Sequence, residues 1–304
     1  MSQINSPSDP TTQEPDRSQI VNTAIKEISH IATLPEITLK IIKLIEDPNS
    51  TAQDLNKVIA GDPALGARIL KVVNSAFYGL PGQIGSINRA IVLLGLNAVK
   101  NIAIAASLAK LFRGGEICPG FAARDLWVHS IAVASGTSLL ADKVGLGLPD
   151  EAFLAGLIHD IGIMVEIQAR RPKFVEAYEG VTSGQYESLR EAELFTLGAT
   201  HEDFGSGLCK QWKFPASFAF VTGYHHHPMD LPEGSRTLAA VVHVADVLAA
   251  RAEMGFTGTI ETKEINPAVM KELGLTNEQL EEIVQLLPQA VEDANILVGE
   301  SAAA

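Results

Sequence analysis

The stretch LAGLIHDIG, residues 154–162, places His159 and Asp160 side by side within an apolar segment. Leucine, isoleucine and valine recur on most sides of the helix that this segment predicts, so we expect the helix to be largely buried. An unpaired, ionised aspartate costs several kcal/mol in such surroundings. A divalent cation removes that cost because it favours the charged carboxylate, and neutral imidazole is the commonest metal ligand. His159 and Asp160 are therefore candidate metal ligands.

Helical signals follow one another on both sides of this segment, and strand signals are almost absent. The longer helices are expected over residues 124–144, 151–168, 201–211 and 236–254. Shorter or terminal helices are expected to begin at the capping boxes 50–53 and 276–279, at Asp62-Pro63, at Ser86 and at Asn97. One short strand is expected over residues 256–261. The predicted fold class is all-α.

Composition divides the chain into three parts. Residues 1–17 are polar and rich in Pro and Ser, which predicts a disordered arm. A turn-rich break at residues 114–120 then separates two helical lobes, an N-terminal lobe over 18–113 and a second lobe over 114–304 that ends in an amphipathic helix.

Charge and hydropathy exclude several classes of protein. The formal net charge of −13 argues against binding to the nucleic-acid backbone, so we expect no direct DNA binding. The N-terminus has no apolar core of a signal peptide, and no uninterrupted apolar run reaches the ~18 residues of a membrane helix. Cys118 and Cys209 cannot form a disulfide framework. These features predict a cytoplasmic protein without a membrane span.

The N-terminal lobe differs in charge from the rest of the chain. Residues 40–113 hold nine Lys or Arg and four Asp or Glu, although the chain as a whole is acidic. Ordinary solvated lysines would explain this excess. The alternative is a docking face for an acidic partner or a nucleotide, in which Lys71, Arg89 and Lys100 could face a groove between the lobes.

More histidines and a second aspartate extend the candidate metal site. Asp246 lies in VVHVADVLAA, with the same apolar surroundings as Asp160 and no Lys or Arg nearby. Taken singly, a histidine on an apolar helix is often a hydrogen-bonded core residue, and the HHH run at 225–227 can be a solvated loop. The ordered set is more specific than its members. It comprises His129, His159, Asp160, His201, His225, His226 and Asp246.

This order resembles the HD superfamily of metal-dependent phosphohydrolases. Within it, NSAFYG (74–79) and SINRAIVLLGLNAVKN (86–101) look like the N-terminal half of an HDOD domain. LAGLIHDIG, ATHEDFGSGLCKQWKFP and HHHP then follow in the order and spacing of that family, and the resemblance covers about residues 20–255. It implies an HD-type helical bundle in the second lobe, related to the HD-GYP cyclic di-GMP phosphodiesterases. It also implies a regulatory or output role in bacterial signalling.

The resemblance further implies how the ligands would share metal ions. By analogy with HD enzymes that hold two metals, one ion would be held by His129, His159, Asp160 and Asp246. The second would be held by Asp160, His201 and one or both of His225 and His226, with Asp160 bridging the two. Imidazole and carboxylate ligands suit one or two divalent transition-metal ions, which could be iron, manganese, nickel or zinc.

The chain departs from the HD-GYP enzymes at two places. Those enzymes carry a lysine three residues after the HD aspartate, where this chain has Ile163, and their GYP motif is absent after the histidine run. The missing lysine removes a cation that would stabilise charge on a scissile phosphate. We therefore expect a regulatory HDOD protein that retains a metal site and binds a signalling protein or a nucleotide-type small ligand. A metal-dependent phosphohydrolase and, less strongly, a di-iron oxygenase are the alternatives, so whether the protein is an enzyme stays open.

Overall fold

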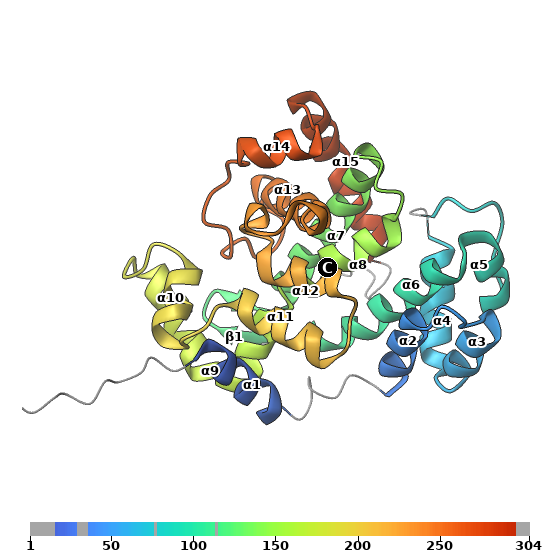
Figure 1. Cartoon of the computed structure of the whole chain (residues 1–304), viewed down its shortest axis with the longest axis horizontal. Helices are drawn as coiled ribbons and strands as arrows, with labels where there is room; N and C mark the ends of the chain where they lie inside the picture. The colour runs from blue at the N-terminus through green and yellow to red at the C-terminus, as the bar shows by residue number, and fades with distance from the viewer. Residues whose placement is uncertain (1–15, 29–35, 76–77, 113–114, 296–304) are drawn as a thin grey trace, which may run out of the picture.

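The computed structural model describes residues 16–28, 36–75, 78–112 and 115–295, and Figure 1 shows their arrangement. Within these residues the fold is all-α, as predicted, and the one sheet pairs β1 (Glu116–Cys118) with β2 (Phe121–Ala122). The strand expected at 256–261 was wrong, since that segment is irregular. The two strands instead lie at the predicted turn-rich break, where Gly120, with φ of 84°, makes the tight turn that pairs Cys118 with Phe121.

The helices fall into an N-terminal series and a longer C-terminal series. The first series is α1 (Arg17–Glu27), α2 (Glu36–Glu46), α3 (Ala52–Ala60), α4 (Pro63–Val73), α5 (Ile87–Leu94) and α6 (Leu96–Leu108). The second is α7 (Ala123–Lys143), α8 (Pro149–Ile158), α9 (Ile161–Thr182), α10 (Leu189–Thr196), α11 (His201–Gln211), α12 (Ala216–Tyr224), α13 (Thr237–Arg251), α14 (Pro267–Leu273) and α15 (Asn277–Asn295). Short 3-10 helices are η1 (Ala109–Phe112), η2 (Pro228–Asp230) and η3 (Glu233–Ser235).

Most of the helix starts follow the predicted caps. The Asp62 and Ser86 side chains accept the backbone N–H groups of Leu65 and Arg89, and Thr276 makes a reciprocal pair with Gln279. Two predicted starts are shifted. The box expected at 50–53 is instead Thr51 with Asp54, because the carboxylate three residues after Thr51 bonds back to its backbone N–H. Helix α6 begins one residue before Asn97, directly after Gly95, whose φ of 91° allows the sharp turn from α5.

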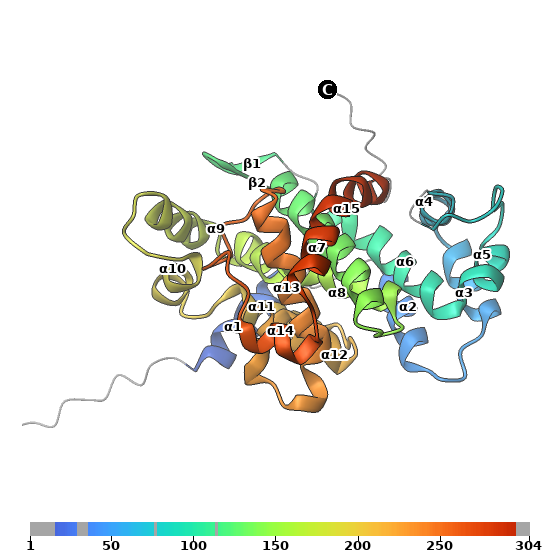
Figure 2. The same ribbon diagram turned by 90° about the horizontal axis from the view of Figure 1, so that it is seen from above.

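Helices α2 to α5 lie together at one side of the molecule, and α6 leads from them to the larger group (Figures 1 and 2). α6 is buried from Ala98 to Leu108 because it packs on α2, α4 and α5 on one side and on α8 on the other. The sequence predicts α1 among the N-terminal helices, but α1 packs on α9 and α11 of the C-terminal series. The lobe boundaries 18–113 and 114–304 stay a prediction. Almost all of the arm expected over 1–17 lies outside the described residues, and Arg17 already begins α1, capped by Asp16.

The expected helix over 151–168 is interrupted at its functional dipeptide. α8 ends at Ile158 and α9 begins at Ile161, so His159 and Asp160 lie in the junction, with Asp160 at φ −97° and ψ 17°. The combined segment 149–182 is long and apolar enough to cross a membrane by composition alone. Of its most apolar window, however, 89% is buried within the protein, as the central helices of a bundle require.

The expected basic groove between the lobes was wrong. Lys100 is 2% exposed, and its ammonium group donates to the Leu44 carbonyl at the end of α2 and to the Ser50 hydroxyl. Lys100 therefore donates its hydrogen bonds to the end of a helix inside the protein and is not available to a ligand. A pocket of about 470 Å³ does lie between the α5–α6 junction and α8, but its charged lining residues are Asp150 and Glu151. Lys71 and Arg89 are exposed and do not line it.

Candidate metal centre

The seven residues predicted as metal ligands converge at one place in the core. They come from α7 (His129), from the α8–α9 junction (His159 and Asp160), from the start of α11 (His201), from the end of α12 (His225 and His226) and from α13 (Asp246). The side chain of His226 is 8% exposed and the others are fully buried. The spacing along the chain therefore identified residues that the fold brings together from five separate segments.

Two glycines allow the helices that carry these ligands to approach closely. A Cβ on Gly162, in the first turn of α9, would lie 1.8 Å from the carbonyl oxygen of His201. A Cβ on Gly156, in α8, would lie 2.8 Å from the Cα of Ala134 in α7. No side chain fits at these distances, so glycine lets α9 meet α11 and lets α8 meet α7 in backbone contact. These close helix contacts fix the positions of His201 and His159 in the core.

One group of ligands surrounds the Asp246 side of the centre. The Oδ1 atom of Asp246 lies 3.0 Å from Nε2 of His129 and 3.7 Å from Nε2 of His159. The Oδ2 atom of Asp160 lies 3.3 Å from Nε2 of His159 and 3.9 Å from Nε2 of His129. His129, His159 and Asp160 form one compact set of possible ligands, and Asp246 lies against the same two imidazoles.

A second group surrounds the other oxygen of Asp160. Its Oδ1 atom lies 3.2 Å from Nε2 of His225 and 3.6 Å from Nε2 of His201. The Nε2 atoms of His201 and His226 are 3.1 Å apart, and Asp160, His201, His225 and His226 form one compact set of possible ligands. Because the two carboxylate oxygens of Asp160 face the two groups separately, Asp160 occupies the position of a bridging ligand.

The imidazole rings are oriented by hydrogen bonds from their far nitrogens. Each of four Nδ1 atoms faces an oxygen that can only accept, so Nδ1 carries a proton and, in the neutral ring that binds metal, Nε2 presents a lone pair to the centre. The acceptors are the backbone oxygens of Met254 for His129 (3.3 Å), Gly156 for His159 (2.7 Å) and Val221 for His225 (3.2 Å), and the Glu193 carboxylate for His201 (2.9 Å). This is the arrangement in which metal-ligating histidines are usually held.

The atoms that face the centre lack hydrogen-bond partners. Among the described side chains, the buried Nε2 atoms of His129, His159 and His225 and all four oxygens of Asp160 and Asp246 are unsatisfied. Buried polar atoms are rarely left in this state without a water or an ion. The donor set of imidazole nitrogens and carboxylate oxygens fits a transition-metal ion, so the residues present suit the group that the sequence predicted.

The pKa values of the residues in the centre also favour a bound cation. Burial alone would raise the pKa of Asp160, but His159, His225 and His201 hold that pKa well below its usual range. Burial likewise opposes the charged form of His159, yet the Asp160 carboxylate raises the pKa of His159 to about 9. The pKa of His226 lies well below its usual range because of burial and the neighbouring His225 and His201. A divalent cation would supply the positive charge that the two carboxylates otherwise draw from protons.

Two buried glutamates behind His201 were missed by the sequence analysis. Glu193, in α10, accepts hydrogen bonds from both the backbone N–H and the Nδ1–H of His201. Glu166, in α9, is fully buried, and neither of its oxygens has a hydrogen-bond partner among the described residues. Burial together with the nearby Glu193 raises the pKa of Glu166 well above the usual range. The sequence does carry a pattern that indicates Glu193, because this residue shares one helix face with the apolar Leu189 and Ala192. An acid on an apolar face shortly before His201 could have been predicted as a buried partner of that histidine.

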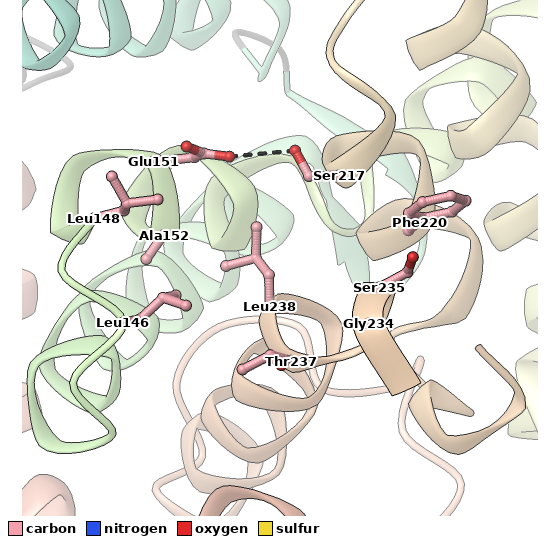
Figure 3. Close-up of a pocket in the computed structure, with 10 residues that line it drawn as sticks. All are labelled: Leu146, Leu148, Glu151, Ala152, Ser217, Phe220, Gly234, Ser235, Thr237 and Leu238. Carbon is pink, nitrogen blue, oxygen red and sulfur yellow. Dashed lines mark hydrogen bonds between the residues drawn. The ribbon is translucent and has the colours of Figure 1, made fainter. Parts of the chain in front are cut away.

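Two pockets border the helices that surround the centre, and one of them reaches it. One, of about 340 Å³, has His226 and Asp246 in its wall and so reaches the ligands from outside. The other, of about 350 Å³, is shown in Figure 3 and is bounded by the first turns of α8, α12 and α13, where Glu151 accepts a hydrogen bond from Ser217. Its wall is mostly apolar, with Leu148, Phe220 and Leu238, and it touches none of the seven ligands.

Comparison with known proteins gives a family and a fold. Residues 31–228 match the family model of the HDOD domain. An uncharacterized protein of Treponema pallidum (strain Nichols) is 23% identical over 221 residues, which are 72% of this chain and 42% of that protein. The chain thus spans less than half the length of this curated relative.

Solved structures match over almost the whole chain. An HDOD domain protein of unknown function from Geobacter sulfurreducens has a TM-score of 0.75 at 24% identity, covering 93% of this chain and 97% of that one. A candidate phosphohydrolase from Shewanella amazonensis SB2B has a TM-score of 0.72 at 23% identity, covering 91% and 98%. At these identities the likeness shows a shared fold.

Proposed function

Because the chain belongs to the HDOD domain family, we propose that it is a signalling protein whose HD-type centre binds transition-metal ions for regulation rather than for turnover. The observation that supports this proposal most strongly is that the full set of candidate ligands is present, but no lysine or arginine in the described part of the chain pairs with the two aspartates to receive a substrate phosphate. Among the described residues, every ion-pair partner of Asp160 and Asp246 is a histidine. A phosphohydrolase needs positive groups that take up the charge developing on phosphate, beyond the ions themselves.

The residues on the Asp246 side would hold one ion, and those around Oδ1 of Asp160 would hold the second. The ligands are His129, His159, Asp160 and Asp246 for the first ion, and Asp160, His201, His225 and His226 for the second. When bound, such ions supply Lewis-acid chemistry to a ligand or water that reaches them. The chain's own contribution is to orient the imidazole rings and to bury the ligating atoms.

Two features of the approach to the centre support regulation over hydrolysis. Ile163, at the position of the HD-GYP lysine, is fully buried in the apolar core. The pocket that reaches Asp246 has Glu261 and Glu264 in its wall and neither Lys nor Arg. A phosphodiester would therefore meet carboxylates and apolar surface on its way to the ions, which disfavours its binding.

We predict that the metal-loaded full chain shows no turnover of cyclic di-GMP or of a panel of nucleotides above that of the metal-free chain. The expected reason is the missing cation at Ile163. The measurement is product formation by chromatography, with Ile163→Lys beside Ile163→Met as the apolar control. Hydrolysis by Ile163→Lys alone would support a centre that is competent for metal but incomplete for catalysis. Robust hydrolysis by the unmodified chain would contradict the regulatory proposal.

That last outcome would favour the second candidate function, a metal-dependent phosphohydrolase. The observation on its side is the bridging position of Asp160, whose two oxygens each face a separate set of histidines. Two-ion centres activate a water and clamp a phosphate between the metals. The turnover assay distinguishes the two functions directly.

The Glu193 side chain offers a second test of the centre. Glu193→Gln keeps the shape of the side chain but removes the charge that holds the Nδ1–H of His201. We expect metal affinity to fall by about 10- to 100-fold for one of two ions, because partners of this kind orient a ligating histidine and raise its basicity. Competition with a chromophoric chelator would measure it. Glu187→Gln, an exposed acid nearby, is the control, and equal affinities in both variants would refute this role.

We also propose that the chain binds a signalling protein or a small ligand. The pocket beside the α5–α6 junction carries Asp150 and Glu151, so it does not suit an anionic nucleotide. Exposed Lys71 and Arg89 leave the outer surface of the N-terminal helices as the place where an acidic partner would bind.

A further inference from the structure

We propose that the pocket beside Asp246 is a vestibule through which divalent cations enter and leave the metal centre, so that the centre exchanges its ions with the solution. This inference rests on the proposed function because it requires the centre to bind metal. The polar groups of its wall that matter here are His226, His227, His243, Asp246, Glu261 and Glu264.

The inner end of the vestibule is the metal centre itself. Asp246 is 1% exposed and lines the pocket, and neither of its carboxylate oxygens has a hydrogen-bond partner among the described residues. His226 lies beside it, with Nδ1 3.9 Å from Oδ2 of Asp246. An ion that reaches this end of the pocket is therefore already in contact with a ligand of the centre.

Two further imidazoles line the same pocket, and neither belongs to the expected ligand set. His243 is 8% exposed, and its Nδ1–H donates to the backbone oxygen of His225 at 2.8 Å. Its Nε2 atom thus presents a lone pair, and like the buried Nε2 of His227 it has no hydrogen-bond partner among the described residues. Unsatisfied imidazole nitrogens in the wall of a pocket are transient ligands for a passing cation.

The outer end of the vestibule carries negative charge. Glu261 and Glu264 are exposed on the segment between α13 and α14, and no Lys or Arg lines the pocket. Clefts lined by one sign of charge raise the local concentration of the opposite ion and accelerate its binding by about 10- to 1,000-fold. From the outside inward, a cation would meet carboxylates, then imidazoles and then the centre. This arrangement favours the entry of cations over that of phosphate anions.

Neither of the two other pockets described above offers such a route. The pocket in Figure 3 and the pocket beside the α5–α6 junction touch none of the seven ligands. Of these three pockets, the acidic vestibule is the one whose wall includes ligands of the centre, His226 and Asp246.

The test is the rate at which Co²⁺ enters the metal-free full chain, followed by stopped-flow absorption at low ionic strength. Glu261→Gln combined with Glu264→Gln removes two charges but preserves shape, including the contact of Glu261 with Ser188. We expect uptake to slow by about 10-fold, with the same final absorption, because neither residue is a ligand of the centre. The difference should vanish in about 1 M salt, where screening is nearly complete.

The matched control is Glu281→Gln combined with Glu292→Gln, which removes two exposed charges from α15. His227→Gln is a second variant, expected to slow uptake several-fold even in high salt because it removes an imidazole rather than a net charge. Uptake rates equal to the control in both vestibule variants would overturn the vestibule and leave the metal centre standing. An unmodified chain that takes up no Co²⁺ at all would overturn both proposals.

Discussion

Asp160→Ala is expected to abolish stable metal binding at both positions, with affinity lowered by more than about 100-fold at each. The reason is geometric. Oδ2 of Asp160 lies 3.3 Å from Nε2 of His159, and Oδ1 lies 3.2 Å from Nε2 of His225. Asp246 reaches the second group only at 3.9 Å, from Oδ2 to Nδ1 of His226. Asp160 makes the shorter contacts to both groups, so its substitution removes a ligand from two ions. Changes in residues that only support a ligand already cost 10- to 100-fold, and loss of a bridging ligand should cost more.

Elemental analysis of the purified variant measures this effect, and two variants control for it. Asp160→Asn keeps the size of the side chain and tests whether charge, rather than folding, is lost. Asp142→Ala removes an exposed aspartate from α7 and should retain the full metal content. If Asp160→Ala binds as much metal as Asp142→Ala, the assignment of the bridging ligand is wrong.

Gly162→Ala is expected to destabilise the chain by about 3 kcal/mol or more and to reduce its metal content. A Cβ at this position would lie 1.8 Å from the His201 carbonyl oxygen and 2.8 Å from the Gly205 backbone nitrogen. Both are backbone atoms, so relief requires α9 and α11 to separate. Overpacking of a core typically costs ~1–3 kcal/mol, and a clash with backbone lies at the upper end of that range. His201 would move with α11, away from Asp160.

Urea unfolding followed by circular dichroism measures the loss of stability in Gly162→Ala. The control is Gly85→Ala, since a Cβ there meets no atom within 4 Å. Equal midpoints for the two variants would show that α9 and α11 do not depend on this close contact. A destabilised Gly162→Ala with full metal content would separate helix packing from the position of His201.

The sequence predicted the all-α fold and the set of seven residues that converge in the core better than it predicted helix ends. Apolar periodicity and capping residues act locally, so α11 begins at the expected residue 201, and α4 and α5 begin where Asp62 and Ser86 predict. The candidate ligands could be chosen from the sequence because a buried ionisable residue is costly, and their apolar neighbours reveal the burial.

The features that were missed depend on packing between distant segments. The break at His159 and Asp160 was not predicted because apolar residues continue through it, and periodicity is not sensitive to a two-residue junction. Lys100 was assigned to a groove because a lysine is usually solvated, whereas here it satisfies the end of α2. α1 packs on α9 and α11 through contacts that no local pattern reveals. Glu193 and Glu166 become informative only once α9, α10 and α11 are placed together.

The most direct test of the central claim is the metal content of the unmodified full chain, purified without a metal-affinity column and analysed for all first-row transition metals. The account predicts one or two equivalents of a transition metal per chain, or the same uptake when the chain is supplied with Fe²⁺, Mn²⁺, Ni²⁺ or Zn²⁺. A folded chain that holds less than about 0.1 equivalent after purification, and takes up none of these ions, would contradict it.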